Sequence, residues 1–211
     1  AKDDSDKQVD TVHFHNLATY LEGSAETPIV NVLAGIRYEY HNWFGHSFVP
    51  RAALMKAVGP FFGKLMVSQA FRAPSPENLS SNSALLPERT TIFELQLALH
   101  IGDYLMVLAN GYYIRIKRPI VFFYDEESET EQYINELGAG TRGVEAEVRF
   151  KYKKHFANLT ASFYDATGSE KIDLYRVPGK SHALLGFSQL QITFNGNFHI
   201  IGGLHLGGSL V

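Results

Sequence analysis

The chain has 211 residues, a formal net charge of −3 and no cysteine. Because 19 basic residues nearly balance 22 acidic ones, the composition argues against a nucleic-acid-binding surface. The lack of cysteine excludes disulfides, thiolate metal sites and a cysteine nucleophile. No apolar run approaches the roughly 18 residues of a transmembrane helix, and the opening residues AKDDSDK lack the apolar region of a signal peptide.

Alternation of apolar and polar residues predicts about ten strands and no helix. After an acidic tail over residues 1–10, the expected strands are residues 11–23, 30–40, 48–58, 62–71, 91–100, 104–123, 133–153, 158–164, 182–194 and 198–211. Pro119 predicts that the sixth strand loses its regular pairing near Lys117. The triplet Asn195-Gly196-Asn197 predicts a hairpin turn.

Residues 143–152 show the alternation most clearly. A strand points successive side chains to opposite faces, so this stretch has one apolar face and one charged face. The apolar face carries Val144, Ala146, Val148, Phe150 and Tyr152, and the charged face carries Glu145, Glu147, Arg149 and Lys151. The apolar face meets either a protein core or lipid.

The connections between these strands alternate in length. They are short at Ser24, Gly59, Gly102, Lys154 and Asn195, and long at His41, Arg72, Tyr124 and Asp165. In an up-and-down meander this places all tight turns at one end, as in outer-membrane barrels. Most strands run ten residues or longer, which suits a membrane-crossing strand better than a soluble one. We therefore expect an all-β fold, an antiparallel up-and-down transmembrane β-barrel segment of about ten strands.

Several motifs resemble the C-terminal barrel region of TonB-dependent outer-membrane receptors over residues 30–211. In chain order they are Gly35-Ile36-Arg37-Tyr38-Glu39-Tyr40, Pro50-Arg51-Ala52-Ala53-Leu54, Ala70 to Ser75, Leu86-Pro87-Glu88-Arg89-Thr90 leading into Phe93-Glu94-Leu95, and Thr141-Arg142-Gly143-Val144-Glu145. The resemblance implies a barrel of about 22 strands with a plugged lumen. It also implies import of a scarce external nutrient, such as an iron-siderophore, haem, cobalamin or a glycan, with energy that TonB transmits.

The sequence departs from that family pattern in several ways. It contains no plug domain and no TonB-contact segment, and it ends on Gly207-Gly208-Ser209-Leu210-Val211, where such barrels close on Phe or Trp. We therefore expect residues 11–211 to form part of a larger receptor barrel in the bacterial outer membrane. The expected partners are membrane lipid, a plug domain outside this chain, the TonB complex and an external small molecule, but no nucleic acid. Two alternatives remain open, namely a passive porin-like channel closed by ten strands and a soluble β-barrel module with an apolar ligand inside.

Two groups of residues are candidates for the functional site. The first group is expected to face the lumen, to solvate it and to pair with the plug; it comprises Arg37, Glu39, Glu94, Glu145, Glu147 and Arg149. The second group, Phe71, Arg72, Ala73 and Pro74, opens a long external loop, where we expect a turn fixed by Pro74 and Pro76. In haem receptors a similar motif precedes a loop with a haem-binding histidine, but residues 72–89 contain none.

Other candidate features favour structural roles. His13 with His15, and His199 with His205, share strand faces but lack an evident third metal ligand, so we interpret them as rim or lumen pairs. The acidic loop at residues 125–131 lacks the pattern of a calcium loop. Aromatic residues near the long loops match an interfacial girdle: Tyr38, Tyr40, Trp43, Phe44, Phe122, Phe123 and Tyr124. No nucleophile–base pair is evident, so we expect no enzyme, no metal and no cofactor.

Overall fold

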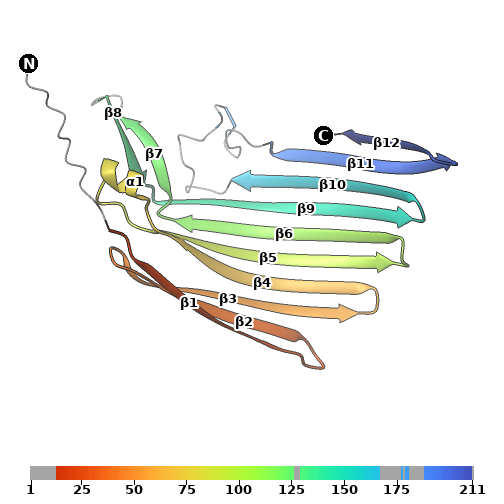
Figure 1. Cartoon of the computed structure of the whole chain (residues 1–211), viewed down its shortest axis with the longest axis horizontal. Coiled ribbons are helices and arrows are strands. Elements are labelled where there is room, and N and C mark those ends of the chain that lie inside the picture. The colour runs from red at the N-terminus through yellow and green to blue at the C-terminus, as the bar shows by residue number, and fades with distance from the viewer. Residues whose placement is uncertain (1–12, 126–128, 167–176, 178, 181–187, 211) are drawn as a thin grey trace, which may run out of the picture.

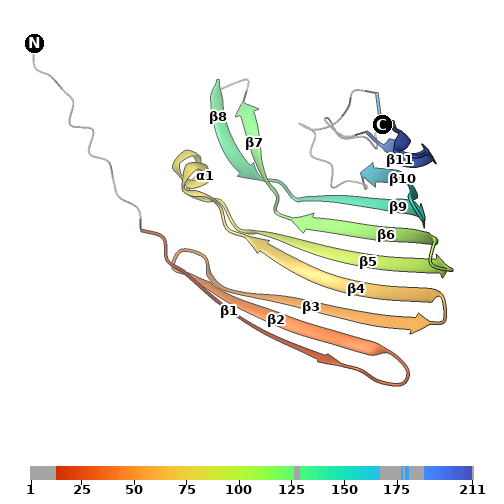
Figure 2. The same cartoon turned by 45° about the vertical axis from the view of Figure 1, so that its right-hand side comes forward.

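The computed structural model describes residues 13–125, 129–166, 177, 179–180 and 188–210. Ten strands form one antiparallel sheet in the order β1-β2-β3-β4-β5-β6-β9-β10-β11-β12 (Figure 1). Their bounds are β1 Asn16–Ala25, β2 Asn31–His41, β3 Gly45–Val58, β4 Phe61–Arg72, β5 Glu88–Ile101, β6 Leu105–Lys117, β9 Gly138–Tyr152, β10 His155–Ala166, β11 Leu190–Ile201 and β12 Leu204–Leu210. The sheet curves without closing, and β1 and β12 are its two edges (Figure 2). The expected up-and-down partial barrel of about ten strands is confirmed.

The strand register gives the sheet two continuous faces. Because directly paired residues lie on the same face of a sheet, the pairing extends the apolar side of β9 across seven strands. The residues in this row, from β3 to β11, are Leu54, Leu65, Leu95, Gly111, Val144, Phe163 and Leu190. The alternate positions of the same strands form the charged face.

The apolar face has no protein cover within the described residues. Leu65, Leu95 and Val144 are 53%, 49% and 59% exposed, although they lie in the middle of the sheet. Apolar patches of this extent are rare on soluble monomers, whereas a lipid-facing barrel wall requires them. We therefore assign the apolar face to lipid and the charged face to the lumen.

One end of the sheet carries short turns, and the larger connections lie at the other end, beside the tight turn between β2 and β3 (Figure 1). The large connections contain a short helix, α1 (Pro76–Ser81), and a separate hairpin of β7 (Ile120–Asp125) and β8 (Thr130–Asn135). The regular part of β6 does stop at Lys117, as expected from Pro119. No helix within the described ranges is long and apolar enough to cross a membrane.

The structure corrects four expectations. A helix is present: Ser75 caps α1 by accepting a hydrogen bond from the Asn78 amide, and Pro76 begins the helix, which is a favoured N-terminal arrangement. The strands expected at 104–123 and 133–153 are each divided, because β7 and β8 leave the main sheet to pair with each other. The expected long loop after His41 is a tight turn, since His41 pairs directly with Gly45.

The fourth correction concerns the last hairpin. Residues 195–197 lie inside β11, where Gly196 pairs with Ala157 on one side and Gly208 on the other. The chain turns instead at Gly202 and Gly203, between β11 and β12. Gly202 has φ +58°, a backbone conformation that glycine adopts at no steric cost.

Candidate functional site

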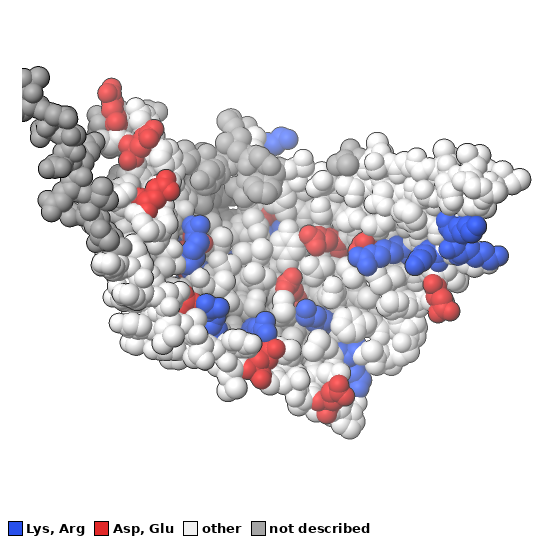
Figure 3. Space-filling model, in the orientation of Figure 1, with Lys and Arg blue, Asp and Glu red and all other residues white. Residues whose placement is uncertain are grey.

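The six charged candidates lie on the lumen face, as the register shows. Tyr112 of β6 pairs with Glu94 in β5 and with Gly143 in β9. Glu145, Glu147 and Arg149 have the same parity as Gly143 and therefore share the face of Glu94. In Figure 3, acidic and basic side chains lie close together across the face of the sheet turned to the viewer. Their role in binding remains a prediction.

Four of these six residues already pair with each other in the wall. Arg37 Nε lies 3.1 Å from Glu39 Oε2. Arg149 uses both Nε and an Nη to contact the two Glu147 oxygens, at 2.6 and 2.7 Å. Such two-pronged contacts are the strongest type of ion pair. Each pair joins residues two apart on one strand, so charge is balanced within single strands.

A further ion pair, which sequence reasoning missed, crosses a strand. Glu22 of β1 and Arg51 of β3 both pair in register with Gly35 of β2, and their side chains bond to each other above it. A Cβ at Gly35 would lie 3.2 Å from Glu22 Oε2 and 3.4 Å from Arg51 Cγ, so glycine provides the space. Together with Arg37 and Tyr20, this pair borders a lumen-face hollow of about 330 Å³.

The centre of the lumen face carries two other polar features. Glu94 borders a small hollow with Lys64, Gln96 and Asn110. On β10, Asn158 Oδ1 is buried and accepts no hydrogen bond from the described residues, although buried polar atoms are normally satisfied.

The motif Phe71-Arg72-Ala73-Pro74, which opens the first long loop, lies at the base of the connections at the long-loop end. Arg72 forms an ion pair of 2.9 Å with Glu88, and the Arg89 guanidinium lies 6.0 Å from the Phe71 ring centroid. Pro74 is buried. Glu88 Oε2 also accepts a hydrogen bond from the Ile120 amide at 3.2 Å, so it connects β4 and β5 to the start of β7.

We call residues 73–87 together with the described part of 118–137 the loop platform. Its two segments bond to each other: Asn82 donates to the Tyr133 carbonyl at 2.9 Å, and the Tyr133 amide donates to Ser81 Oγ at 2.9 Å. The Asn135 side chain accepts from the Leu86 amide at 2.7 Å and donates to the carbonyls of Leu86 and Arg118. These contacts make the platform an ordered unit, where the sequence suggested two separate loops.

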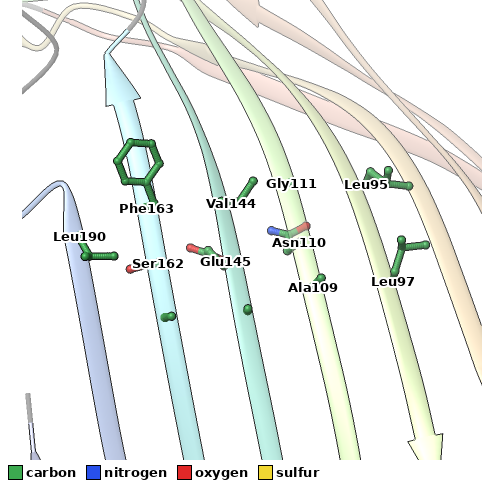
Figure 4. A pocket seen from close by; sticks show the side chains of 12 residues that line it. Leu95, Leu97, Ala109, Asn110, Gly111, Val144, Glu145, Ser162, Phe163 and Leu190 are labelled. Carbon is green, nitrogen blue, oxygen red and sulfur yellow. The ribbon is translucent and has the colours of Figure 1, made fainter.

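The apolar face also has a hollow, of about 320 Å³. Figure 4 shows the side chains that line it, including Leu95, Leu97, Val144, Phe163 and Leu190. Small residues such as Ala109 and Gly111 form its floor. Because its walls are hydrocarbon and lie on the lipid side, we interpret it as space for an acyl chain and not as a site for an imported ligand.

The histidine pairs lie at opposite ends of the sheet. His13 and His15 precede β1, and their backbones bond to the Asn42 side chain. His199 and His205 pair across β11 and β12 beside the final turn. Within the described residues, no group of three or more His, Cys, Asp or Glu side chains could hold a metal ion.

The structure is an open antiparallel sheet of long strands, with one apolar face and one charged face. This combination is that of the wall of an outer-membrane β-barrel. The family model described as "TonB dependent receptor-like, beta-barrel" matches residues 2–198. The chain belongs to this family, whose members are bacterial outer-membrane receptors that transport ligands and are not enzymes. No curated protein matches the chain.

Solved structures with the same fold include siderophore receptors. The siderophore receptor PirA from Acinetobacter baumannii superposes with a TM-score of 0.74 at 14% identity, covering 95% of this chain and 34% of that one. PirA from Pseudomonas aeruginosa superposes with a TM-score of 0.66 at 17% identity, covering 87% of this chain and 36% of that one. The ferripyoverdine receptor of Pseudomonas aeruginosa, in a structure with bound ferripyoverdine, superposes with a TM-score of 0.70 at 15% identity. The match covers 93% of this chain and 28% of that one. The chain thus spans about a third of the length of these receptors.

Proposed function

We propose that this chain forms part of the barrel wall of a receptor that imports a scarce nutrient, such as an iron-siderophore, with energy supplied through TonB. The observation that carries the proposal is the family match over residues 2–198, on a wall with separate lipid and lumen faces. The siderophore receptors among its structural relatives support this ligand class. A plug domain and the TonB contact belong to the receptor as a whole.

In this proposal the loop platform meets the ligand first. The platform lies at the long-loop end, which in outer-membrane barrels faces outward. Its hairpin exposes Phe122, Phe123 and Tyr124 by 38%, 38% and 47%, which gives flat surfaces for contact. Phe71, Arg72, Ala73 and Pro74 support the platform, and the lumen candidates line the passage below; these are Arg37, Glu39, Glu94, Glu145, Glu147 and Arg149.

Uptake of a radiolabelled ferric siderophore by cells that express the complete natural protein tests the proposal. Saturable uptake that stops when an uncoupler removes the proton-motive force is the expected result. Haem, cobalamin and glycans serve as parallel ligands. Non-saturable uptake that an uncoupler does not change would instead indicate a passive porin-like channel.

A substitution in the platform tests its role separately. Asn135→Ala removes the acceptor of the solvent-exposed Leu86 amide, which weakens the platform by about 0.5–1.5 kcal/mol. We expect a raised KM for uptake with unchanged heat stability of the barrel. Asn31→Ala, at the start of β2 and far from the platform, is the control. An unchanged KM for Asn135→Ala would contradict the role of the platform.

A further inference from the structure

Two histidines face each other beside the final short turn. His199 of β11 pairs directly with His205 of β12. Their ring centroids are 5.1 Å apart and the ring planes meet at 76°. Both side chains have lumen-face parity, because Asn195 and Asn197 of β11 pair with Asn158 and Phe156 of β10.

The hydrogen bonds of the two rings determine which nitrogens carry hydrogen. His199 Nε2 lies 2.6 Å from the Gly202 carbonyl oxygen, and His205 Nδ1 lies 2.9 Å from Asn197 Oδ1. Since these oxygens only accept, each of those nitrogens donates. A neutral imidazole has one donor and one acceptor nitrogen, so His199 Nδ1 and His205 Nε2 carry lone pairs. Histidines that bind metals are typically oriented in this way, with the second nitrogen donating to an oxygen.

The group that orients His205, the Asn197 side chain, lies over a glycine. Asn197 pairs in register with Gly207, and a Cβ at Gly207 would come within 3.2 Å of Asn197 Nδ2. Glycine at this position therefore lets the Asn197 amide lie across β12 and reach His205.

We propose that His199 and His205 bind one divalent transition-metal ion, which links β11 to β12 at the short-turn end of the barrel. A metal about 2.0–2.1 Å from one nitrogen of each ring, at a tetrahedral angle, places the two centroids roughly 5 Å apart, close to the observed separation. Water completes the coordination, because the described residues provide no third ligand. Among divalent ions that accept imidazole, copper(II) binds most strongly.

Copper titration of the complete natural protein tests this site. The protein is purified in detergent through a tag without histidine, stripped with a chelator and titrated with copper(II) chloride. We expect one saturable ion whose electron paramagnetic resonance spectrum shows coupling to two imidazole nitrogens. His199→Ala and His205→Ala each lose the two-nitrogen signal. His100→Ala, which removes a lumen-face histidine beside another short turn at the same end, retains it.

Two further variants separate a metal site from a hydrogen-bonding role. Asn197→Ala and Gly207→Ala keep both ligands but disturb the orientation of His205, so we expect copper affinity to fall by roughly 10- to 100-fold. Heat-modifiable migration on gels verifies that each variant is folded. The proposal is overturned if the unsubstituted protein shows no two-nitrogen signal. It is equally overturned if the histidine variants bind copper as the unsubstituted protein does.

Discussion

At the scale of single residues, glycines on the lumen face allow side chains to cross strands. Gly35 lies beneath the Glu22–Arg51 ion pair, Gly143 beneath the Tyr112 ring and Gly207 beneath the Asn197 amide. Each glycine pairs in register with the residue, or residues, whose side chain covers it. These three side-chain groups therefore lie over a neighbouring strand where a Cβ is absent.

Substitution of Gly143 tests this relation. A Cβ there would overlap the Tyr112 phenol and lie 2.7 Å from the Phe163 carbonyl oxygen, whereas a Cβ at Gly111 meets nothing within 4 Å. We expect Gly143→Ala to destabilise the barrel by about 1–3 kcal/mol through overpacking, and Gly111→Ala to have little effect. Urea unfolding of the complete natural protein in detergent measures both. Equal losses for the two variants would contradict the explanation.

At the scale of elements, strand faces could be predicted from sequence but strand partners could not. The alternation of Val144, Val148 and Phe150 with Glu145, Glu147 and Arg149 determines the two faces of β9, because the side-chain period of a strand is two. The Glu22–Arg51 pair depends on the register of three strands, which no local pattern contains. The placement of the six lumen candidates on one face was accessible in the same way, and so was the proximity of Arg37 to Glu39 and of Glu147 to Arg149, because each pair is two residues apart on one strand.

The misplaced turn and the missed helix have different causes. Asn195-Gly196 satisfies the preference of a two-residue hairpin, but pairing with β10 continues β11 through Asn197 and pairing with β12 continues it to Ile201. Gly202-Gly203 then serves as the turn. The helix had a local signal in Ser75 followed by Pro76. That signal is short, and the surrounding Pro, Ser and Asn residues suggested an irregular loop. The order of the loop platform depends on Asn82 and Asn135, whose partners are about 50 residues away in sequence.

An arginine scan across β9 and β10 tests the assignment of the two faces. Val148 lies on the apolar face and Thr160 on the lumen face, paired with Glu147. At the membrane midplane an outward arginine costs about 2–4 kcal/mol, so we expect that loss for Val148→Arg. Thr160→Arg should change stability by within about 0.5 kcal/mol. Unfolding in lipid vesicles provides the measurement, and a reversed order of the two variants would assign the apolar face to the lumen.

At the scale of the whole molecule, the sheet has two open edges and one broad apolar face. Of the described strands, β1 and β12 each have a single neighbour, and unpaired strand edges promote association. The related receptors are about three times as long as this chain. Their additional length is the natural source of the strands that would close the wall.

The behaviour of the isolated 211 residues follows from those edges. Without detergent, we expect this chain to aggregate, because its unpaired strand edges can pair with other chains and its exposed apolar face can associate with other apolar surfaces. Size-exclusion chromatography with light scattering is the measurement, with the complete natural protein in detergent as the control. A folded, monodisperse monomer in plain buffer would contradict the lipid assignment.

The ion pairs within single strands have a consequence for whatever moves through the lumen. Arg37 is neutralised by Glu39, and Arg149 by Glu147, without help from another strand. A body that shifts or leaves the lumen therefore does not have to separate these opposite charges. In the receptor that we propose, these two ion pairs alone would therefore add little resistance to the movement of a lumen occupant.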